Sequence, residues 1–195
     1  ENSFVALEYE VPYNQSRLDC LLFGKGEGDS YNIVLIELKQ WTSVTALPEE
    51  GNFVETYTGG RERVVPHPSQ QAKGYHYYLT GFVEEFEKTP TLNLFSCAYC
   101  HNYSRSDGKG LFNPVYSELI RDFPLYTKED PRILGARIKE LLDKGSGFEI
   151  FNRFMQSRIH PSKKLLENVH RVIKNDVVFS LLNEQLVAKN LIWAH

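Results

Sequence analysis

The sequence predicts an α/β fold in which a central sheet is flanked by helices. Residues 16–41 contain two neighbouring strands, 17–23 and 31–38, joined by a polar, glycine-rich turn. The second strand carries an almost unbroken apolar run at 33–36, which is typical of a strand buried on both faces. Helical patterns of apolar residues then occur at 67–88 and 129–145.

The length and composition indicate one sizeable core. A chain of 195 residues with 42% hydrophobic and 13% aromatic residues is globular rather than disordered. We expect a main domain over residues 1–145 and a helical extension over 146–195.

The net charge, the hydropathy and the cysteine count bear on three classes of protein: nucleic-acid-binding, membrane and disulfide-rich proteins. A net charge of −3 argues against a global basic field for tight, sequence-independent binding of nucleic acid. No apolar run reaches the length of a membrane span, so we expect no membrane partner. Three cysteines, an odd number, argue against a disulfide framework and favour a reducing, cytoplasmic setting.

Charged residues follow the apolar run at the end of the second strand. Glu37 and Lys39 stand two residues apart and therefore point to one side of a strand. Asp19 lies on the preceding strand, where a hairpin would bring it beside Glu37. Two carboxylates on adjacent strands suit a hard cation such as Mg²⁺, and a lysine beside them suits hydrolysis of a phosphodiester. The alternative is an ordinary salt-bridged strand end.

The first segment, residues 4–11, alternates and predicts a strand antiparallel to the Asp19 strand. The alternation places Val5, Leu7 and Tyr9 on one face, and Glu8 and Glu10 on the other. Arg17 precedes Asp19 and would contact a phosphate, neutralise the carboxylates or form a plain salt bridge.

Residues 42–66 contain a predicted hairpin. Two short runs, 53–57 and 61–65, flank Gly59 and Gly60, which favour a tight turn. Such an excursion from the sheet would be able to shape a substrate channel.

A helix is predicted from His67 onward, with Pro68 in its first turn. Tyr75 is on its apolar face, one turn after Gln71. Aromatic residues at this spacing stack nucleic-acid bases or, more commonly, fill the core. His67 is either a ligand-contacting residue or a helix-entry residue that bonds the backbone.

The strand predicted at 91–103 contains Cys97 and Cys100 followed by His101, which formally matches a haem-attachment motif. Haem, zinc and redox chemistry are the functional alternatives, but the segment has the pattern of a buried strand. Buried free cysteines explain it more simply.

The remaining elements are a loop at 105–112, a short helix at 113–123, a strand at 124–128 and the helix at 129–145, with Ile133 among its inward residues. Helices at 147–159 and 161–175 follow. Their basic side chains would track a nucleic-acid backbone or form a solvated face. The sequence contains no glycine-rich phosphate loop, so we expect no ATP hydrolysis.

The residues Asp19, Glu37 and Lys39, in "RLD" and "IVLIELKQW", resemble the core motif of the PD-(D/E)XK nuclease superfamily. Leu18 stands where that motif usually has a proline. The resemblance implies a restriction-endonuclease-like mixed central sheet and a Mg²⁺- or Mn²⁺-dependent nuclease.

The resemblance also implies residue roles. Asp19, Glu37 and the backbone carbonyl of Leu38 would bind the metal, completed by Glu8 or Glu10, which stay unranked. Lys39 would position or activate water, and Gln71 would orient the site. The residues expected to contact nucleic acid are Arg17, His67, Lys73 and Tyr75.

A narrower resemblance covers most of the chain. The segments "LEYEVP", "SRLD", "IELKQW" and "HPSQQAKGY" resemble the nuclease domain that precedes a Schlafen-type P-loop helicase in bacterial proteins. Residues 177–192 resemble the entry segment of that helicase. This implies a helicase partner in the same full-length chain and favours DNA as substrate. The alternative function is a catalytically inactive nucleic-acid-binding or docking module of that helicase.

Overall fold

The computed structural model describes residues 2–11, 16–88, 92–105 and 110–162. The described residues form a main sheet of five strands in the order β1-β2-β3-β7-β8. These strands are β1 (Phe4–Glu10), β2 (Arg17–Lys25), β3 (Tyr31–Lys39), β7 (Leu92–Cys100) and β8 (Leu125–Thr127). Strands β1, β2 and β3 are antiparallel neighbours, whereas β7 and β8 add in parallel. The sheet is therefore mixed.

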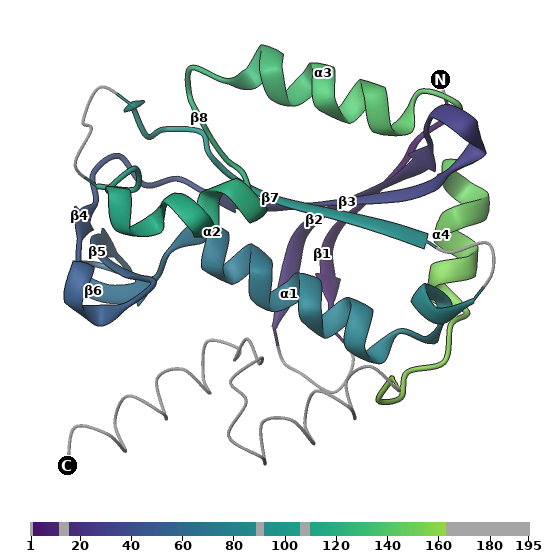
Figure 1. Cartoon of the computed structure of the whole chain (residues 1–195), viewed down its shortest axis with the longest axis horizontal. Coiled ribbons are helices and arrows are strands. Elements are labelled where there is room, and N and C mark those ends of the chain that lie inside the picture. Colours follow the sequence, from purple (N-terminus) through teal and green to yellow (C-terminus); the bar gives the residue numbers. More distant parts are fainter. Residues whose placement is uncertain (1, 12–15, 89–91, 106–109, 163–195) are drawn as a thin grey trace.

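A smaller three-stranded sheet lies at one end of the molecule (Figure 1). It consists of β4 (Thr45–Ala46), β5 (Phe53–Thr58) and β6 (Arg61–Pro66). Gly59 and Gly60 form the β5–β6 turn with φ of 59° and 82°. Two successive positive φ values are what a tight hairpin turn requires, and this explains the glycine pair.

Helices cover both faces of the main sheet (Figure 1). Helices α1 (Pro68–Phe82) and α2 (Ser117–Asp122) lie on one face, and α3 (Pro131–Leu142) lies on the other. Helix α4 (Gly147–Met155) packs against β1 and β2. The described 3₁₀ turns are η1 (Glu27–Asp29), η2 (Pro48–Glu50), η3 (Glu84–Glu87) and η5 (Pro114–Tyr116). The predicted α/β class, with a mixed central sheet flanked by helices, is confirmed.

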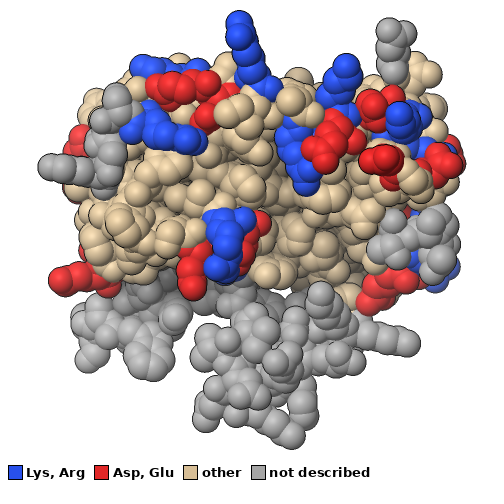
Figure 2. All heavy atoms as spheres, turned by 45° about the horizontal axis from the view of Figure 1, so that its top comes forward, with Lys and Arg blue, Asp and Glu red and all other residues tan. Residues whose placement is uncertain are grey.

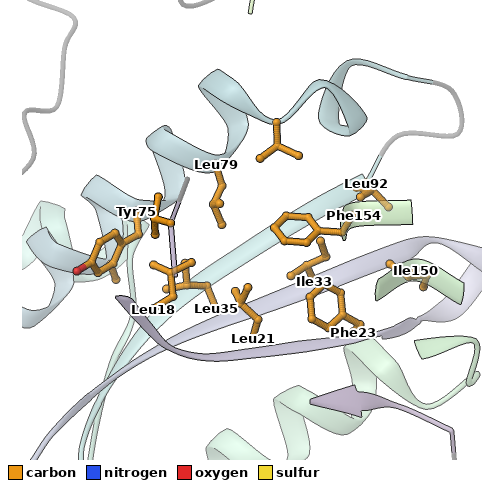
Figure 3. Close-up of a cluster of buried hydrophobic side chains, with 13 residues drawn as sticks. Leu18, Leu21, Phe23, Ile33, Leu35, Tyr75, Leu79, Leu92, Ile150 and Phe154 are labelled. Carbon is orange, nitrogen blue, oxygen red and sulfur yellow. The ribbon is translucent and has the colours of Figure 1, made fainter. Parts of the chain in front are cut away.

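The largest buried cluster lies between the sheet and helices α1 and α4 (Figure 3). Strand residues Leu21, Phe23 and Ile33 meet Leu79 of α1 and Phe154 of α4, and all are at most 2% exposed. Helix α4, which the sequence assigned to the extension, thus shares the core of the sheet. The predicted helix at 161–175 and the segment 177–192 lie almost entirely outside the described residues.

The predicted facing of the first strand is wrong. Val5 and Leu7 are 50% and 66% exposed, whereas Tyr9 packs against the core together with Phe4 and Ala6. The cause is Glu8, whose φ of 51° is left-handed. One such residue breaks the strict two-residue alternation, so the side chains after it change face.

Two further helix predictions need correction. Helix α1 ends at Phe82 instead of continuing to residue 88, because Val83 is extended and η3 follows. On α3, Ile133 was predicted to point inward but is 61% exposed. No helix in the described part of the chain is long and apolar enough to cross a membrane.

Candidate functional site

The ends of β2 and β3 separate just where their polar residues begin. Backbone pairing of these strands includes Cys20 opposite Ile36, and the next step brings Asp19 level with Glu37. Here Oδ2 of Asp19 accepts a hydrogen bond of 2.7 Å from the Leu38 backbone N–H. The aspartate side chain therefore occupies the place of a backbone acceptor and is fixed against β3.

Glu37 and Lys39 lie on the same side of β3, as their spacing predicts. Nζ of Lys39 donates to Oε1 of Glu37 at 2.6 Å. Glu37 is 1% exposed, and its Oε2 has no hydrogen-bond partner among the described residues. Burial raises the pKa of Glu37 to about 7; Lys39 opposes this rise and the nearby Asp19 carboxylate adds to it.

Helix α1 brings two more polar groups to this point. Tyr75 is 6% exposed, and its hydroxyl oxygen lies at the margin of the buried cluster (Figure 3). Nε2 of Gln71 donates to that hydroxyl at 3.4 Å. Burial raises the pKa of Tyr75, and the negative charge of Glu37 raises it further. The structure thus brings together Asp19, Glu37, Lys39, Gln71 and Tyr75.

The two candidate third carboxylates differ in position. Glu8 lies between the pairs Leu7–Cys20 and Tyr9–Leu18, level with Asp19 on the adjacent strand. Glu10 pairs with Arg17, further along the strands, and all three of Glu8, Glu10 and Arg17 are exposed. Within the described residues, no group of three or more carboxylate, histidine or cysteine side chains is gathered closely enough to hold a metal ion.

Burial contradicts the prediction that His67 contacts nucleic acid. The imidazole is 0% exposed, its Nδ1 accepts from Ser69 N at 3.1 Å, and its Nε2 donates to Leu111 O at 3.0 Å. Burial lowers the pKa of His67 to about 4, so the ring is neutral. His67 is the N-cap of α1.

Tyr75 also differs from the expectation that its ring contacts the substrate. The Tyr75 ring is buried in the core cluster, which contradicts base stacking by this residue. Its hydroxyl, not its ring, is the part that reaches the site. Lys73 is half-buried and lies near Asp122 of α2, whose pKa it helps to lower.

A cleft of about 650 Å³ opens beside these groups. One side is the end of β3 and the segment after it, and the other side is the β5–β6 hairpin. Lys39 and Gln71 line the cleft, so these two members of the polar cluster face it. The full lining consists of Leu38, Lys39, Gln40, Trp41, Thr42, Ser43, Thr56, Tyr57, Thr58, Val65, Pro66 and Gln71. The hairpin therefore forms one wall of a cleft next to the site.

Trp41 is a site-lining residue that the sequence pattern did not single out. The Lys39 ammonium lies 5.6 Å from the centre of its ring. The only available signal was its position two residues after Lys39, where a continuing strand would turn it to the same side.

Cys97 and Cys100 lie in two different buried clusters. Cys97 packs with Cys20 and Val34 beneath α3, whereas Cys100 belongs to a different buried cluster with Tyr103 and Leu111. They lie three residues apart on one strand and so face opposite sides of the sheet. Burial raises the pKa of each thiol to about 12, and neither is disulfide-bonded in the described structure.

No protein-family model, no curated protein and no solved structure matches this chain.

Proposed function

We propose that this chain is a metal-dependent nuclease that hydrolyses phosphodiester bonds in nucleic acid. The observation that carries the proposal is the meeting of Asp19, Glu37 and Lys39 at the end of β2 and β3, next to a cleft that Lys39 lines. A buried carboxylate is costly unless it is paired or binds a metal, and Lys39 pairs with only one of the two oxygens of Glu37.

The donor set fits a hard divalent cation. Asp19 and Glu37 supply carboxylate oxygens, and Oε2 of Glu37 is buried without a hydrogen-bond partner among the described residues. Oxygen donors of this kind suit Mg²⁺ or Mn²⁺. Such an ion supplies a water of lowered pKa and neutralises charge on the phosphoryl oxygens. The Leu38 carbonyl and Glu8, which is level with Asp19, are the proposed further ligands; Glu10 lies further away along the strand.

Protein side chains would perform the remaining tasks. The Lys39 ammonium lines the cleft and is placed to stabilise negative charge as the phosphodiester is attacked. Gln71 also lines the cleft and is held by the Tyr75 hydroxyl, so it would orient the attacking water or a phosphate oxygen. Arg17 is exposed at the start of β2 and is the proposed external phosphate contact.

The wider setting rests on the sequence resemblance. A restriction-endonuclease-like nuclease domain that precedes a Schlafen-type helicase would act on DNA in the cytoplasm, with the helicase as its partner in one longer chain. The segment 177–192, which resembles the entry to that helicase, would lead to it.

The test is cleavage of circular and linear DNA, and of RNA, with Mg²⁺ or Mn²⁺ added. We expect Lys39→Ala and Asp19→Ala to lower the cleavage rate by roughly 100-fold or more, because each removes a group that acts on the developing charge. Lys139→Ala, an exposed lysine on α3, is the matched control and should cut like the wild type. Equal cutting by all four proteins would refute the assignment.

A catalytically inactive binding or docking module is the second candidate. It is favoured by the occupied oxygens: Oδ2 of Asp19 binds the Leu38 amide and Oε1 of Glu37 binds Lys39. Titration with Mg²⁺ or Mn²⁺ separates the two functions. A metal site raises the melting temperature in a concentration-dependent way, and Asp19→Ala should abolish that rise. An inactive module gives no rise in either protein.

A further inference from the structure

The cleft beside the site has the size of a small-ligand pocket rather than of a groove for a double helix. Its volume of about 650 Å³ is within the usual range for bound small molecules, and one or two nucleotides fill such a space. A cleft of this volume holds single nucleotides and does not enclose a duplex. This favours unpaired nucleotides as the occupants of the cleft.

The chemistry of the lining is that of a single-strand site. Among the described lining residues, Lys39 is the only charged one and none is acidic. The rest of the wall offers the Trp41 ring and the hydroxyls of Thr42 and Thr58. Non-specific single-strand sites combine a positively charged groove with aromatic side chains for stacking. In this cleft Lys39 and Trp41 supply one group of each kind.

Two arginines extend the hairpin wall beyond the cleft. On β6, Arg63 pairs with Thr56 and Arg61 pairs with Thr58. Paired residues of an antiparallel hairpin project from the same face, so both arginines share the face of the two threonines that line the cleft. Both are exposed, the Arg63 guanidinium lies beside Gly59 at the turn, and neither forms an ion pair with the described acidic residues.

The α3 side of the molecule has a different charge pattern. In Figure 2, basic and acidic side chains are interspersed on the visible face. On α3 itself Arg137 pairs with Glu140 at 2.8 Å. This side offers no comparable row of unpaired cations next to a cleft among the residues described.

We infer that the cleft between the β3 exit and the β5–β6 hairpin binds one unpaired strand of nucleic acid. Trp41 stacks on a base, and Arg61 and Arg63 hold the phosphates that leave the cleft. This inference rests on the proposed function, because it places the scissile phosphate at the Asp19 and Lys39 end. It adds the substrate class, which is a single strand or the unpaired part of a branched substrate.

The binding test uses the full chain without divalent cation, so that no cleavage is needed. The probes are a fluorescent single-stranded oligonucleotide, as DNA and as RNA, and a DNA duplex of the same sequence. We expect tighter binding of the single strand by roughly tenfold or more. Arg61→Ala/Arg63→Ala should weaken that binding roughly tenfold and reduce the slope of log K against log salt by about 1.4, which is about 0.7 for each lost phosphate contact.

The matched control is Arg132→Ala/Lys139→Ala, which removes two exposed cations from α3. It should bind the oligonucleotide like the wild type and melt at the same temperature. If the two double variants weaken binding equally, or if the duplex binds as tightly as the single strand, the inference is wrong.

Fluorescence tests the stacking directly. The chain contains two tryptophans, and replacing Trp193 by Phe leaves Trp41 as the sole indole. Addition of single strand should quench this emission. Trp41→Phe, which keeps a ring, should bind more tightly than Trp41→Ala by roughly 5- to 150-fold, the range for loss of one stacked base. Unchanged emission at saturation would overturn the role of Trp41.

The outcomes also separate this inference from the nuclease proposal. The protein could bind single strands through the hairpin arginines and yet cleave nothing with any metal. This result would support single-strand binding in the cleft and refute the proposed nuclease activity. Alternatively, cleavage could depend on Asp19 and Lys39 while Arg61→Ala/Arg63→Ala leaves binding unchanged. This result would support the nuclease activity and refute single-strand binding in the cleft.

Discussion

Glu37 is the residue that connects stability to the proposed chemistry. Its pKa is raised by burial to about 7, from an ordinary value of 4.5. Between these pH values the unfolded chain releases the proton while the folded chain keeps it, so folding stability falls as pH rises. Below pH 4.5 both states are protonated and the full contribution is present. The native site therefore holds a carboxylate that is close to its point of titration near neutral pH.

We predict that Glu37→Gln removes the fall in folding stability that the Glu37 carboxyl causes as pH rises. The free energy of unfolding of the variant, relative to that of the wild type, should rise by roughly 3 kcal/mol between pH 4.5 and 7. Urea unfolding at several pH values measures it. Glu149→Gln, an exposed carboxylate on α4, is the control. A pH-independent difference for Glu37→Gln would contradict the prediction.

The comparison between variant and wild type is needed because His67 acts in the opposite direction. Its pKa is lowered by burial to about 4, from 6.5. Between these values the His67 imidazole is protonated in the unfolded chain but neutral in the folded chain, so folding stability rises with pH. The two windows overlap, and the wild type alone shows only their sum.

At the scale of elements, helix α4 depends on close backbone contact. A Cβ at Gly147 would collide with the Phe4 backbone nitrogen of β1 and the Phe23 backbone oxygen of β2. A side chain at this position would move the helix away from the sheet.

We predict that Gly147→Ala destabilises the fold by roughly 1–3 kcal/mol, the usual range for overpacking. Gly135→Ala on α3 is the matched control, because no atom lies within 4 Å of the new Cβ. It should stabilise by about 0.5–1 kcal/mol through helix propensity. Thermal unfolding of both variants measures the contrast, and the same sign for both would contradict the packing argument.

Elements with strong local signals were predicted from the sequence, and those set by a single backbone angle were not. The β2–β3 hairpin follows from the apolar run and the polar turn, and the β5–β6 hairpin follows from its glycine pair. The facing of β1 was missed because Glu8 adopts a left-handed φ that no residue pattern announces. Similarly, Val83 ends α1 although the apolar periodicity continues.

The candidate site shows the same division. The meeting of Asp19, Glu37 and Lys39 follows from strand spacing and a hairpin, so the sequence was sufficient to predict it. The cleft was not predictable, because its second wall is a hairpin whose position depends on tertiary packing. The Tyr75 hydroxyl was also missed, since a helical aromatic stripe does not reveal which ring ends at a polar group.

At the scale of the whole molecule, the core does not end at the predicted boundary. Ile150 and Phe154 of α4 lie in the same buried cluster as Leu21 and Phe23 of β2. A chain that stops at residue 145 would expose these strand residues to water.

We therefore predict that residues 1–145 alone do not fold cooperatively. Loss of two large side chains from the core costs roughly 4–10 kcal/mol, which is comparable to the stability of a typical domain. Circular dichroism during heating, compared with the full chain, measures this. A sharp transition near that of the full chain would show that α4 is dispensable for the fold.

The proposed active groups and the hairpin wall all derive from residues 8–75, whereas β7, β8, α3 and α4 contribute mainly apolar support. The earlier part of the chain thus carries the proposed chemistry, and the later part mainly completes the hydrophobic core. A substitution in the earlier stretch is able to silence the protein while it stays folded. A substitution in the later stretch is expected to impair function by unfolding the protein.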